Sequence, residues 1–216
     1  MHRSRISGRD IERAAAVVRG GGLIAFPTET YYGLGVDPFN ERALQRLFTL
    51  KNRATVKPVL VLVGDRSQVN LLASRVPQTA HTLMDAFWPG PLTLVLPARA
   101  DLSSLLTGGT ATVGVRLSPH PDAVSLVRAF GAPLTATSAN RAGEPAAVSA
   151  EEVYAFFGDR VDMILDGGRT PGVQASTLVG VGDDTVECIR EGRIPFEEIR
   201  AALRPQAGRA AAGYKR

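Results

Sequence analysis

The chain has 216 residues, of which 44% are hydrophobic and 21% are charged, and its formal net charge is +4. This composition is typical of a globular protein with one α/β domain, and it excludes a fibrous or fully disordered chain. No apolar run approaches the roughly 20 residues that a membrane-spanning helix needs, and the N-terminus lacks the apolar segment of a signal peptide. We therefore expect a cytoplasmic protein with no membrane partner.

The positive charge is concentrated at the C-terminus. Residues 204–216 contain four of the 25 Lys and Arg residues and no acidic residue, so the 21 basic residues that remain balance the 21 acidic ones. A basic tail can contact RNA or extend into solvent, and the charge alone favours the second interpretation. We expect a folded domain over residues 8–203 and a disordered basic tail over residues 204–216.

Cysteine and histidine offer little sign of a metal or redox site. The single cysteine, Cys188, excludes an intrachain disulfide, and its place in an apolar-alternating stretch favours a structural thiol over a nucleophile. The three histidines (His2, His81 and His120) lack the spacing of zinc ligands. We therefore expect no metal bound by protein side chains.

Hydrophobic periodicity predicts helices and strands in alternation along the chain. Ser7 with Asp10 three residues later is typical of a helix start, and the glycines at 20–22 end that helix. Residues 27–35 (PTETYYGLG) are interpreted as a loop. Further helices are expected from Asn40 and over residues 80–87, 122–130, 149–157 and 195–203. Strands are expected over residues 23–26, 59–63, 92–96, 112–116, 134–137, 163–165, 177–181 and 186–190.

The last two strands indicate the type of sheet. A Gly-Asp-Asp turn separates residues 177–181 from residues 186–190, which predicts an antiparallel hairpin. The strands also outnumber the crossover helices that a purely parallel sheet would require. We therefore expect a single α/β domain with a mixed, largely antiparallel sheet and packed helices.

The glycine-rich motifs that bind nucleotides are absent, both G-x-x-x-x-G-K-[ST] and G-x-G-x-x-G. A polyphosphate would therefore have to be held by side chains. Polar residues two apart in extended backbone point to the same side of the chain. Three such pairs follow an apolar strand or a helix end: Thr28/Thr30, Lys51/Arg53 and Ser138/Asn140.

Each of these features also has an ordinary structural explanation. Cations are favoured at the C-terminus of a helix, where Lys51 and Arg53 lie, and Ser and Asn are common in turns. Arg116 and Arg190 end strands, where a solvated arginine is the usual outcome. However, Lys57 brings a third cation close to Arg53, and a compact cationic group suits a phosphate or a carboxylate.

Together these segments resemble one family, the YrdC-like threonylcarbamoyl-AMP synthases. The resemblance covers residues 8–203 and includes the K-x-R and S-x-N pairs that mark the synthases within this fold. The matching stretches are FPTETYYGLG (26–35), KNR (51–53), KPVLVLV (57–63), FWPGPLTLVL (87–96), TVGVRL (112–117), SAN (138–140), DGG (166–168), ST (176–177) and IREG (189–192).

The resemblance implies a YrdC-like fold, a twisted mixed sheet with a concave basic face. It implies a nucleotidyltransferase that makes threonylcarbamoyl-AMP and pyrophosphate from L-threonine, bicarbonate and ATP, with Mg²⁺ as a cofactor. A separate threonylcarbamoyl transferase complex would then modify tRNA beside the anticodon, and direct tRNA binding by this chain is an open question. The implied ATP contacts are Arg53, Lys57, Thr112, Ser138, Asn140 and Arg190, the threonine contacts are Thr30, Arg116, Ala136 and Ser176, and the catalytic residues are Lys51 and Arg53.

Two other functions fit the same fold. A non-catalytic module could use a basic face to bind double-stranded RNA or tRNA. A carbamoyl-adenylating transferase would use carbamoyl phosphate in place of threonine. Longer members of the family have an additional C-terminal domain over the site, and we expect none here because only residues 204–216 follow the domain.

Overall fold

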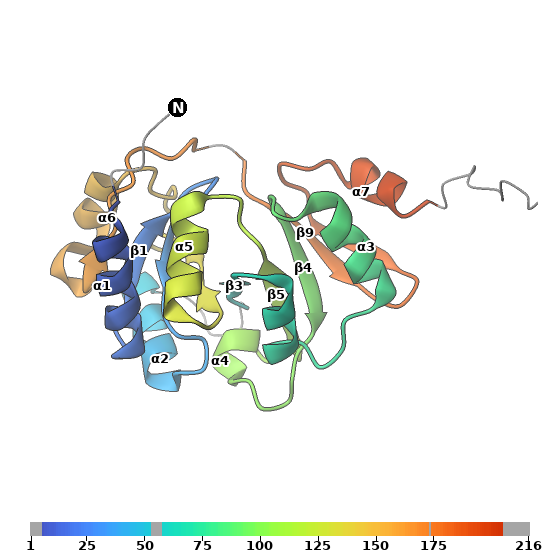
Figure 1. Ribbon diagram of the computed structural model, residues 1–216, viewed down its shortest axis with the longest axis horizontal. Coiled ribbons are helices and arrows are strands. Elements are labelled where there is room, and N and C mark those ends of the chain that lie inside the picture. The colour runs from blue at the N-terminus through green and yellow to red at the C-terminus, as the bar shows by residue number, and fades with distance from the viewer. Residues whose placement is uncertain (1–5, 53–57, 173, 205–216) are drawn as a thin grey trace, which may run out of the picture.

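The computed structural model describes residues 6–52, 58–172 and 174–204. In this part of the chain, helices cover two mixed sheets (Figure 1). The helices are α1 (Gly8–Arg19), α2 (Glu41–Lys51), α3 (Gln78–Phe87), α4 (Ser104–Thr107), α5 (Pro121–Phe130), α6 (Ala150–Phe157) and α7 (Phe196–Ala202), with 3-10 helices at Arg66–Leu71 and Gly158–Arg160. None of the helices in these ranges has the length and apolar character needed to span a membrane.

The four-stranded sheet has the order β7-β2-β1-β8. It contains β1 (Ile24–Pro27), β2 (Tyr32–Gly35), β7 (Thr137–Ser138) and β8 (Met163–Ile164). Strand β1 is antiparallel to β2 and parallel to β8, and β2 is antiparallel to β7. The prediction of a loop over residues 27–35 was therefore wrong for its second half, because β2 pairs on both edges and its four residues are buried.

The six-stranded sheet has the order β10-β9-β4-β5-β3-β6. It contains β3 (Leu60–Leu62), β4 (Leu92–Pro97), β5 (Thr112–Arg116), β6 (Leu134–Thr135), β9 (Thr177–Val181) and β10 (Val186–Arg190). The predicted hairpin is confirmed, since β9 and β10 are antiparallel. Pairs β4–β9 and β3–β5 are parallel, whereas β4–β5 and β3–β6 are antiparallel, so the expected mixed sheet with packed helices is confirmed, although the strands are divided between two sheets.

The two sheets are joined at the strand that was expected over residues 134–137. Its first part, β6, pairs with β3 of the larger sheet, and its second part, β7, pairs with β2 of the smaller one. Between them, the Ala136 N–H donates to the Leu60 carbonyl oxygen at 2.8 Å. A strand that changes sheets can bring residues from both sheets to one place, and the chain does so here.

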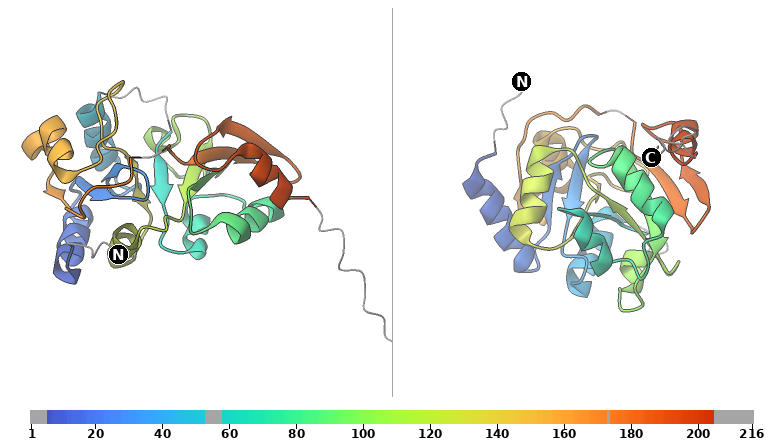
Figure 2. Two further views of the ribbon diagram at one scale, coloured as in Figure 1. Left: turned by 90° about the horizontal axis from the view of Figure 1, so that it is seen from above. Right: turned by 45° about the vertical axis from the view of Figure 1, so that its right-hand side comes forward.

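Local sequence signals explain the starts of α1 and α2. The Ser7 hydroxyl accepts a hydrogen bond from the Asp10 N–H, and the Asp10 carboxylate accepts one from the Ser7 N–H, so both halves of a capping box are present. Asn40 Oδ1 accepts from the Ala43 N–H at 3.1 Å at the start of α2. Helix α1 packs against α5, and α3 packs against α7. Figure 2 shows α1 and α6 on the side of the smaller sheet, and α3 and α7 on the side of β9 and β10.

Candidate active site

A cavity of about 590 Å³ lies where the two sheets meet. Its walls come from the β1–β2 turn, from β3, β4 and β5, from the β6–β7 junction and from the start of β9 and the end of β10. Seven of the predicted site residues line it: Thr30, Thr112, Arg116, Ala136, Ser138, Ser176 and Arg190. Arg53 and Lys57 lie outside the described residues.

The turn between β1 and β2 is held by its own hydroxyl groups. The Thr28 hydroxyl donates to the Tyr31 carbonyl oxygen at 2.7 Å and accepts from the Thr30 N–H at 3.3 Å. The Thr28 and Thr30 hydroxyl oxygens lie 3.2 Å apart. The side chains of Thr28 and Thr30 therefore face the same side, as the spacing of two predicted, and both line the cavity.

Tyr32 connects this turn to the DGG segment. Its hydroxyl donates to the Gly168 carbonyl oxygen at 2.7 Å and accepts from the Gly167 N–H at 3.2 Å. Burial raises the pKa of Tyr32 to about 12, although the hydrogen bond from Gly167 opposes this shift. The hydroxyl therefore stays protonated and able to donate, and the DGG segment acts as a support for the cavity wall.

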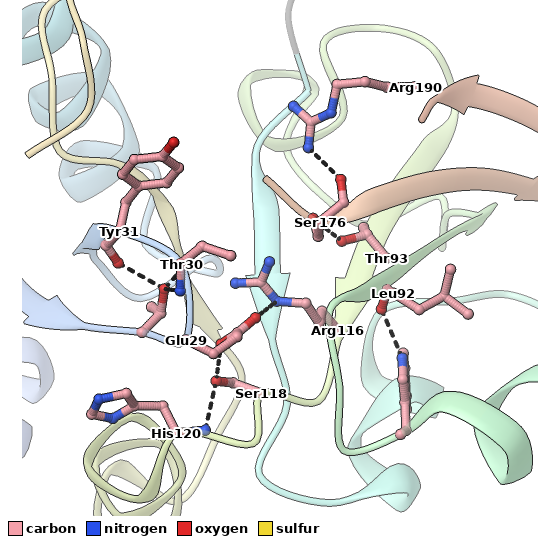
Figure 3. A network of polar contacts seen from close by, with 12 residues as sticks. Glu29, Thr30, Tyr31, Leu92, Thr93, Arg116, Ser118, His120, Ser176 and Arg190 are labelled. Atoms are coloured by element: carbon pink, nitrogen blue, oxygen red, sulfur yellow. Dashed lines mark hydrogen bonds and ion pairs between the residues drawn. The ribbon is translucent and has the colours of Figure 1, made fainter. Parts of the chain in front are cut away.

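Arg116, which lines the cavity, forms a buried ion pair with Glu29 (Figure 3). Arg116 Nε lies 3.3 Å from Glu29 Oε1, and the two side chains are only 4% and 9% exposed. The hydroxyl of Ser118 donates to Glu29 Oε2, and the His120 N–H donates to that hydroxyl at 3.1 Å. Burial lowers the pKa of Arg116, the Glu29 carboxylate opposes this effect, and Arg190 adds to it.

Ser176, Thr93 and Arg190 form a second group, which comes from the β10-β9-β4 part of the larger sheet, next to the strand β5 that carries Arg116. The Thr93 and Ser176 hydroxyl oxygens are 2.9 Å apart, and both residues are buried. The Arg190 guanidinium donates to the Ser176 carbonyl oxygen at 2.9 Å, which attaches the end of β10 to the start of β9. Burial lowers the pKa of Arg190. A cation and two hydroxyl groups are thus presented together.

Gly192 allows this close arrangement. A Cβ atom at Gly192 would lie 2.2 Å from the Ala175 carbonyl oxygen and 2.5 Å from the Ser176 carbonyl carbon. Both distances are too short for any side chain, so only glycine permits the chain after β10 to pass Ser176 at this distance. The Gly192 N–H in turn donates to the Thr177 hydroxyl at 3.0 Å.

The SAN segment and Lys51 are arranged differently from the prediction. The Ser138 hydroxyl donates to Asn140 Oδ1 at 2.6 Å, and the Asn140 amide donates to the Glu144 carbonyl oxygen at 2.6 Å. Lys51 Nζ donates to the carbonyl oxygens of Ser138 and Asn140 and to Asn140 Oδ1. Ser138 lines the cavity, but Lys51 and Asn140 are not among its lining residues.

This placement corrects the expectation that the Lys51 ammonium is one of the pocket cations. The Lys51 side chain is buried, with three oxygen atoms of the SAN segment around its nitrogen. A charged group surrounded in this way orders the segment that presents Ser138. The K-x-R and S-x-N motifs are therefore joined in space, with the lysine beneath the segment that carries the serine.

Sequence reasoning missed three buried polar residues of the site: Glu29, Thr93 and Ser118. Glu29 and Arg116 are far apart in the sequence, so no local pattern links them. A signal did exist for Ser118, because it follows Arg116 at the same spacing of two that identified the other pairs. Thr93 lies inside an apolar strand, where a single threonine has no distinguishing pattern.

The cavity lining is suited to anions. It combines two arginines with the hydroxyl groups of Thr28, Thr30, Ser138 and Ser176, while an apolar part is formed by residues such as Leu178 and Ile189. Among the lining residues that the structure describes, none carries a carboxylate. In the ranges that the structure describes, no cluster of three or more His, Cys, Asp or Glu side chains could hold a metal ion.

Comparison with known proteins identifies similar chains. The Sua5/YciO/YrdC family model, described as "Telomere recombination", matches residues 16–192. The threonylcarbamoyl-AMP synthase of Pyrococcus abyssi is 38% identical over 93% of this chain and 59% of its own length. The threonylcarbamoyl-AMP synthase of Bacillus subtilis is 41% identical over 90% of this chain and 57% of its own length.

A solved structure is also similar. The crystal structure of P. abyssi Sua5 complexed with L-threonine has a TM-score of 0.87 and 38% sequence identity, and the match covers 92% of this chain and 58% of the other. The YrdC-like fold inferred from the motifs is thereby confirmed. The chain spans less than two thirds of the length of these relatives.

Proposed function

The chain belongs to the Sua5/YciO/YrdC family, and from this membership we propose that it is an L-threonylcarbamoyladenylate synthase. The reaction joins L-threonine, bicarbonate and ATP to give threonylcarbamoyl-AMP, pyrophosphate and water. The amine of threonine is first carboxylated, and the new carboxylate then attacks the α-phosphate while pyrophosphate leaves. The relatives' names support this proposal, as does the L-threonine bound to P. abyssi Sua5.

One observation carries the proposal: seven residues from separated motifs line a single cavity of about 590 Å³ that has positive charge and hydroxyl groups. The attack of a carboxylate on a polyphosphate brings two anions together. The nucleophile is already ionised at that step, so the protein must mainly neutralise charge and align the reacting groups. A lining with arginines and without carboxylates suits this requirement.

The two arginines suggest which end of the cavity takes which substrate. A guanidinium binds a carboxylate through two parallel hydrogen bonds, and Arg116 and Thr30 both line the cavity. We assign Arg116, Thr30, Ala136 and Ser176 to threonine. Arg190, Thr112 and Ser138 are assigned to ATP, together with Arg53 and Lys57. Asn140 and Lys51 then act by holding the segment that presents Ser138.

Mg²⁺ would supply positive charge to the triphosphate and help pyrophosphate to leave. The described residues contain no group of three metal-ligating side chains, so its ligands would come largely from ATP and water. The product is a reactive mixed anhydride. A second enzyme, a threonylcarbamoyl transferase, would have to consume it to modify tRNA.

The deciding experiment is mass detection of threonylcarbamoyl-AMP after the protein is mixed with ATP, Mg²⁺, L-threonine and bicarbonate. We expect product and pyrophosphate only when all the substrates are present. An RNA-binding module would release no pyrophosphate under any of these conditions. Pyrophosphate release with carbamoyl phosphate but not with threonine would identify a carbamoyl-adenylating transferase instead.

A further inference from the structure

The buried carboxylate of Glu29 has a role that the sequence motifs did not indicate. We propose that Glu29 is a positioning residue, which fixes the Arg116 guanidinium so that its two terminal amino groups meet the carboxylate of the amino-acid substrate. This inference rests on the proposed function in one respect, because it takes the ligand of the cavity to be an amino acid.

The orientation of the guanidinium supports this role. Glu29 Oε1 faces Arg116 Nε at 3.3 Å, so the carboxylate blocks the Nε side of the guanidinium. The terminal amino groups point away from Glu29 (Figure 3), and they make no hydrogen bond with any described residue. The side left open carries two parallel N–H groups, which is the geometry that binds a carboxylate through both oxygens.

Glu29 is itself fixed by a short chain of hydrogen bonds. The backbone N–H of His120, next to the start of α5, donates to the Ser118 hydroxyl at 3.1 Å. That hydroxyl donates to Glu29 Oε2, which leaves Oε1 for Arg116. Ser118 is 1% exposed. These hydrogen bonds hold the Glu29 carboxylate in one orientation, and the ion pair with that fixed charge orients the guanidinium before the substrate arrives.

Direct contact between Glu29 and the substrate is disfavoured. Glu29 Oε1 and Arg116 Nε are both buried and neither makes a hydrogen bond with a described residue, so the two groups meet as an ion pair that a ligand in the cavity does not reach. A carboxylate in contact with an anionic substrate would also repel it. Glu29 therefore acts through Arg116, for which it also offsets part of the cost of burying a cation.

The test compares Glu29→Gln and Ser118→Ala with wild type. Calorimetry gives Kd for L-threonine and for L-threonine amide, which lacks the carboxylate, and kinetics give KM for threonine and for ATP. We expect Glu29→Gln to raise Kd and KM for threonine about tenfold, with KM for ATP changed less than about twofold. Ser118→Ala should shift the same quantities about threefold, because the Glu29 charge remains. For the amide, wild type and Glu29→Gln should have the same Kd.

Glu152→Gln is the matched control. Glu152 also pairs with an arginine, since its Oε1 lies 3.4 Å from Arg169 Nη1, but it is not among the residues that line the cavity. The same loss of charge there should leave every Kd and KM unchanged. Thermal melting of each variant shows which ones are folded, and Ser118→Ala keeps the test available if Glu29→Gln does not fold.

Unchanged or tighter threonine binding in a folded Glu29→Gln protein would overturn the inference, as would an equal rise in KM for both substrates. If wild type binds threonine but makes no product, the proposed function fails while the binding comparison still tests Glu29. If wild type does not bind threonine, both proposals fail.

Discussion

Lys51 and Asn140 are 89 residues apart in the sequence, yet the lysine ammonium donates to the Asn140 carbonyl oxygen at 2.8 Å and to its Oδ1 at 3.1 Å. The same nitrogen donates to the Ser138 carbonyl oxygen. The end of α2 thus fixes the segment that presents Ser138 to the cavity. The lysine of one motif and the serine and asparagine of the other form a single structural unit.

Lys51→Met should therefore destabilise the fold and weaken ATP binding together. Removal of the ammonium leaves buried oxygen acceptors without their donor, which costs about 1–3 kcal/mol in the free energy of unfolding. We expect urea unfolding to report this loss and KM for ATP to rise more than KM for threonine. Arg42→Met, an exposed change on the same helix, should shift stability by less than about 0.5 kcal/mol. A stable Lys51→Met protein with normal ATP binding would contradict the placement of Lys51.

The Arg116–Glu29 pair predicts a non-additive effect on stability. Arg116→Met alone leaves the Glu29 carboxylate buried without its cation, which should cost about 3–5 kcal/mol. The double variant Arg116→Met/Glu29→Gln removes the stranded charge as well, so it should regain part of that loss. Denaturant unfolding of the wild type, both single variants and the double variant measures the coupling. Strictly additive losses would mean that the two charges do not interact.

Periodicity and capping predicted the helices well. The starts of α1 and α2 follow from Ser7 and Asn40, whose side chains cap the helices as expected. The four-residue helix α4 and the two 3-10 helices were not predicted, because segments this short have no repeating apolar face. Strand β2 was missed because hydroxyls and glycines around it resemble a loop, whereas pairing on both edges makes it a strand.

The site was predicted in part. Spacing identified Thr30 and Ser138 as candidates, and the family resemblance added the strand-end residues Arg116 and Arg190. All four line one cavity. Spacing could not identify Glu29, since only folding brings it to Arg116. The direction of the Lys51 side chain could not be predicted from the sequence either. A position at the end of a helix does not determine whether a cation faces a ligand or another loop.

His120 predicts a dependence of stability on pH. Its Nδ1 is a buried atom that lies 3.9 Å from Asp122 Oδ2. Burial lowers the pKa of His120 below its ordinary value of 6.5, and this effect outweighs the carboxylates of Asp122 and Glu29, which raise it. The folded state therefore holds the imidazole neutral. The stability that the neutral imidazole contributes is fully present above the unfolded pKa of 6.5, and it is lost as the pH falls below 6.5 and through the lowered folded pKa.

His120→Gln should reduce this loss. Below about pH 6.5, the unfolding free energy of wild type should fall by up to about 1.4 kcal/mol per pH unit from this group, and the variant should lack that component. Urea unfolding across the range measures both slopes. His81 is exposed on α3, so His81→Gln should keep the wild-type slope. A slope unchanged in His120→Gln would show that the imidazole is not held neutral.

Gly192 provides a steric test of the wall that holds Ser176 and Arg190. A methyl group at this position would meet the backbone of Ala175 and Ser176 at 2.2 to 2.6 Å, so the backbone itself must move to admit it. Gly192→Ala should cost about 1–3 kcal/mol of stability, as expected for an overpacked site. It should also lower kcat/KM for both substrates, because Ser176 lies on the moving segment and Arg190 is bonded to it.

The control is Gly180, a glycine inside β9. A Cβ atom at Gly180 would lie 3.6 Å from the Ile189 side chain and 4.0 Å from that of Glu187, which are ordinary contact distances. Gly180→Ala should therefore leave both stability and kcat/KM near wild type. If Gly192→Ala and Gly180→Ala have the same stability and the same kcat/KM, the close approach of Gly192 to Ser176 does not matter for activity. A selective loss in Gly192→Ala would instead show that the position of Ser176 depends on a residue with no side chain.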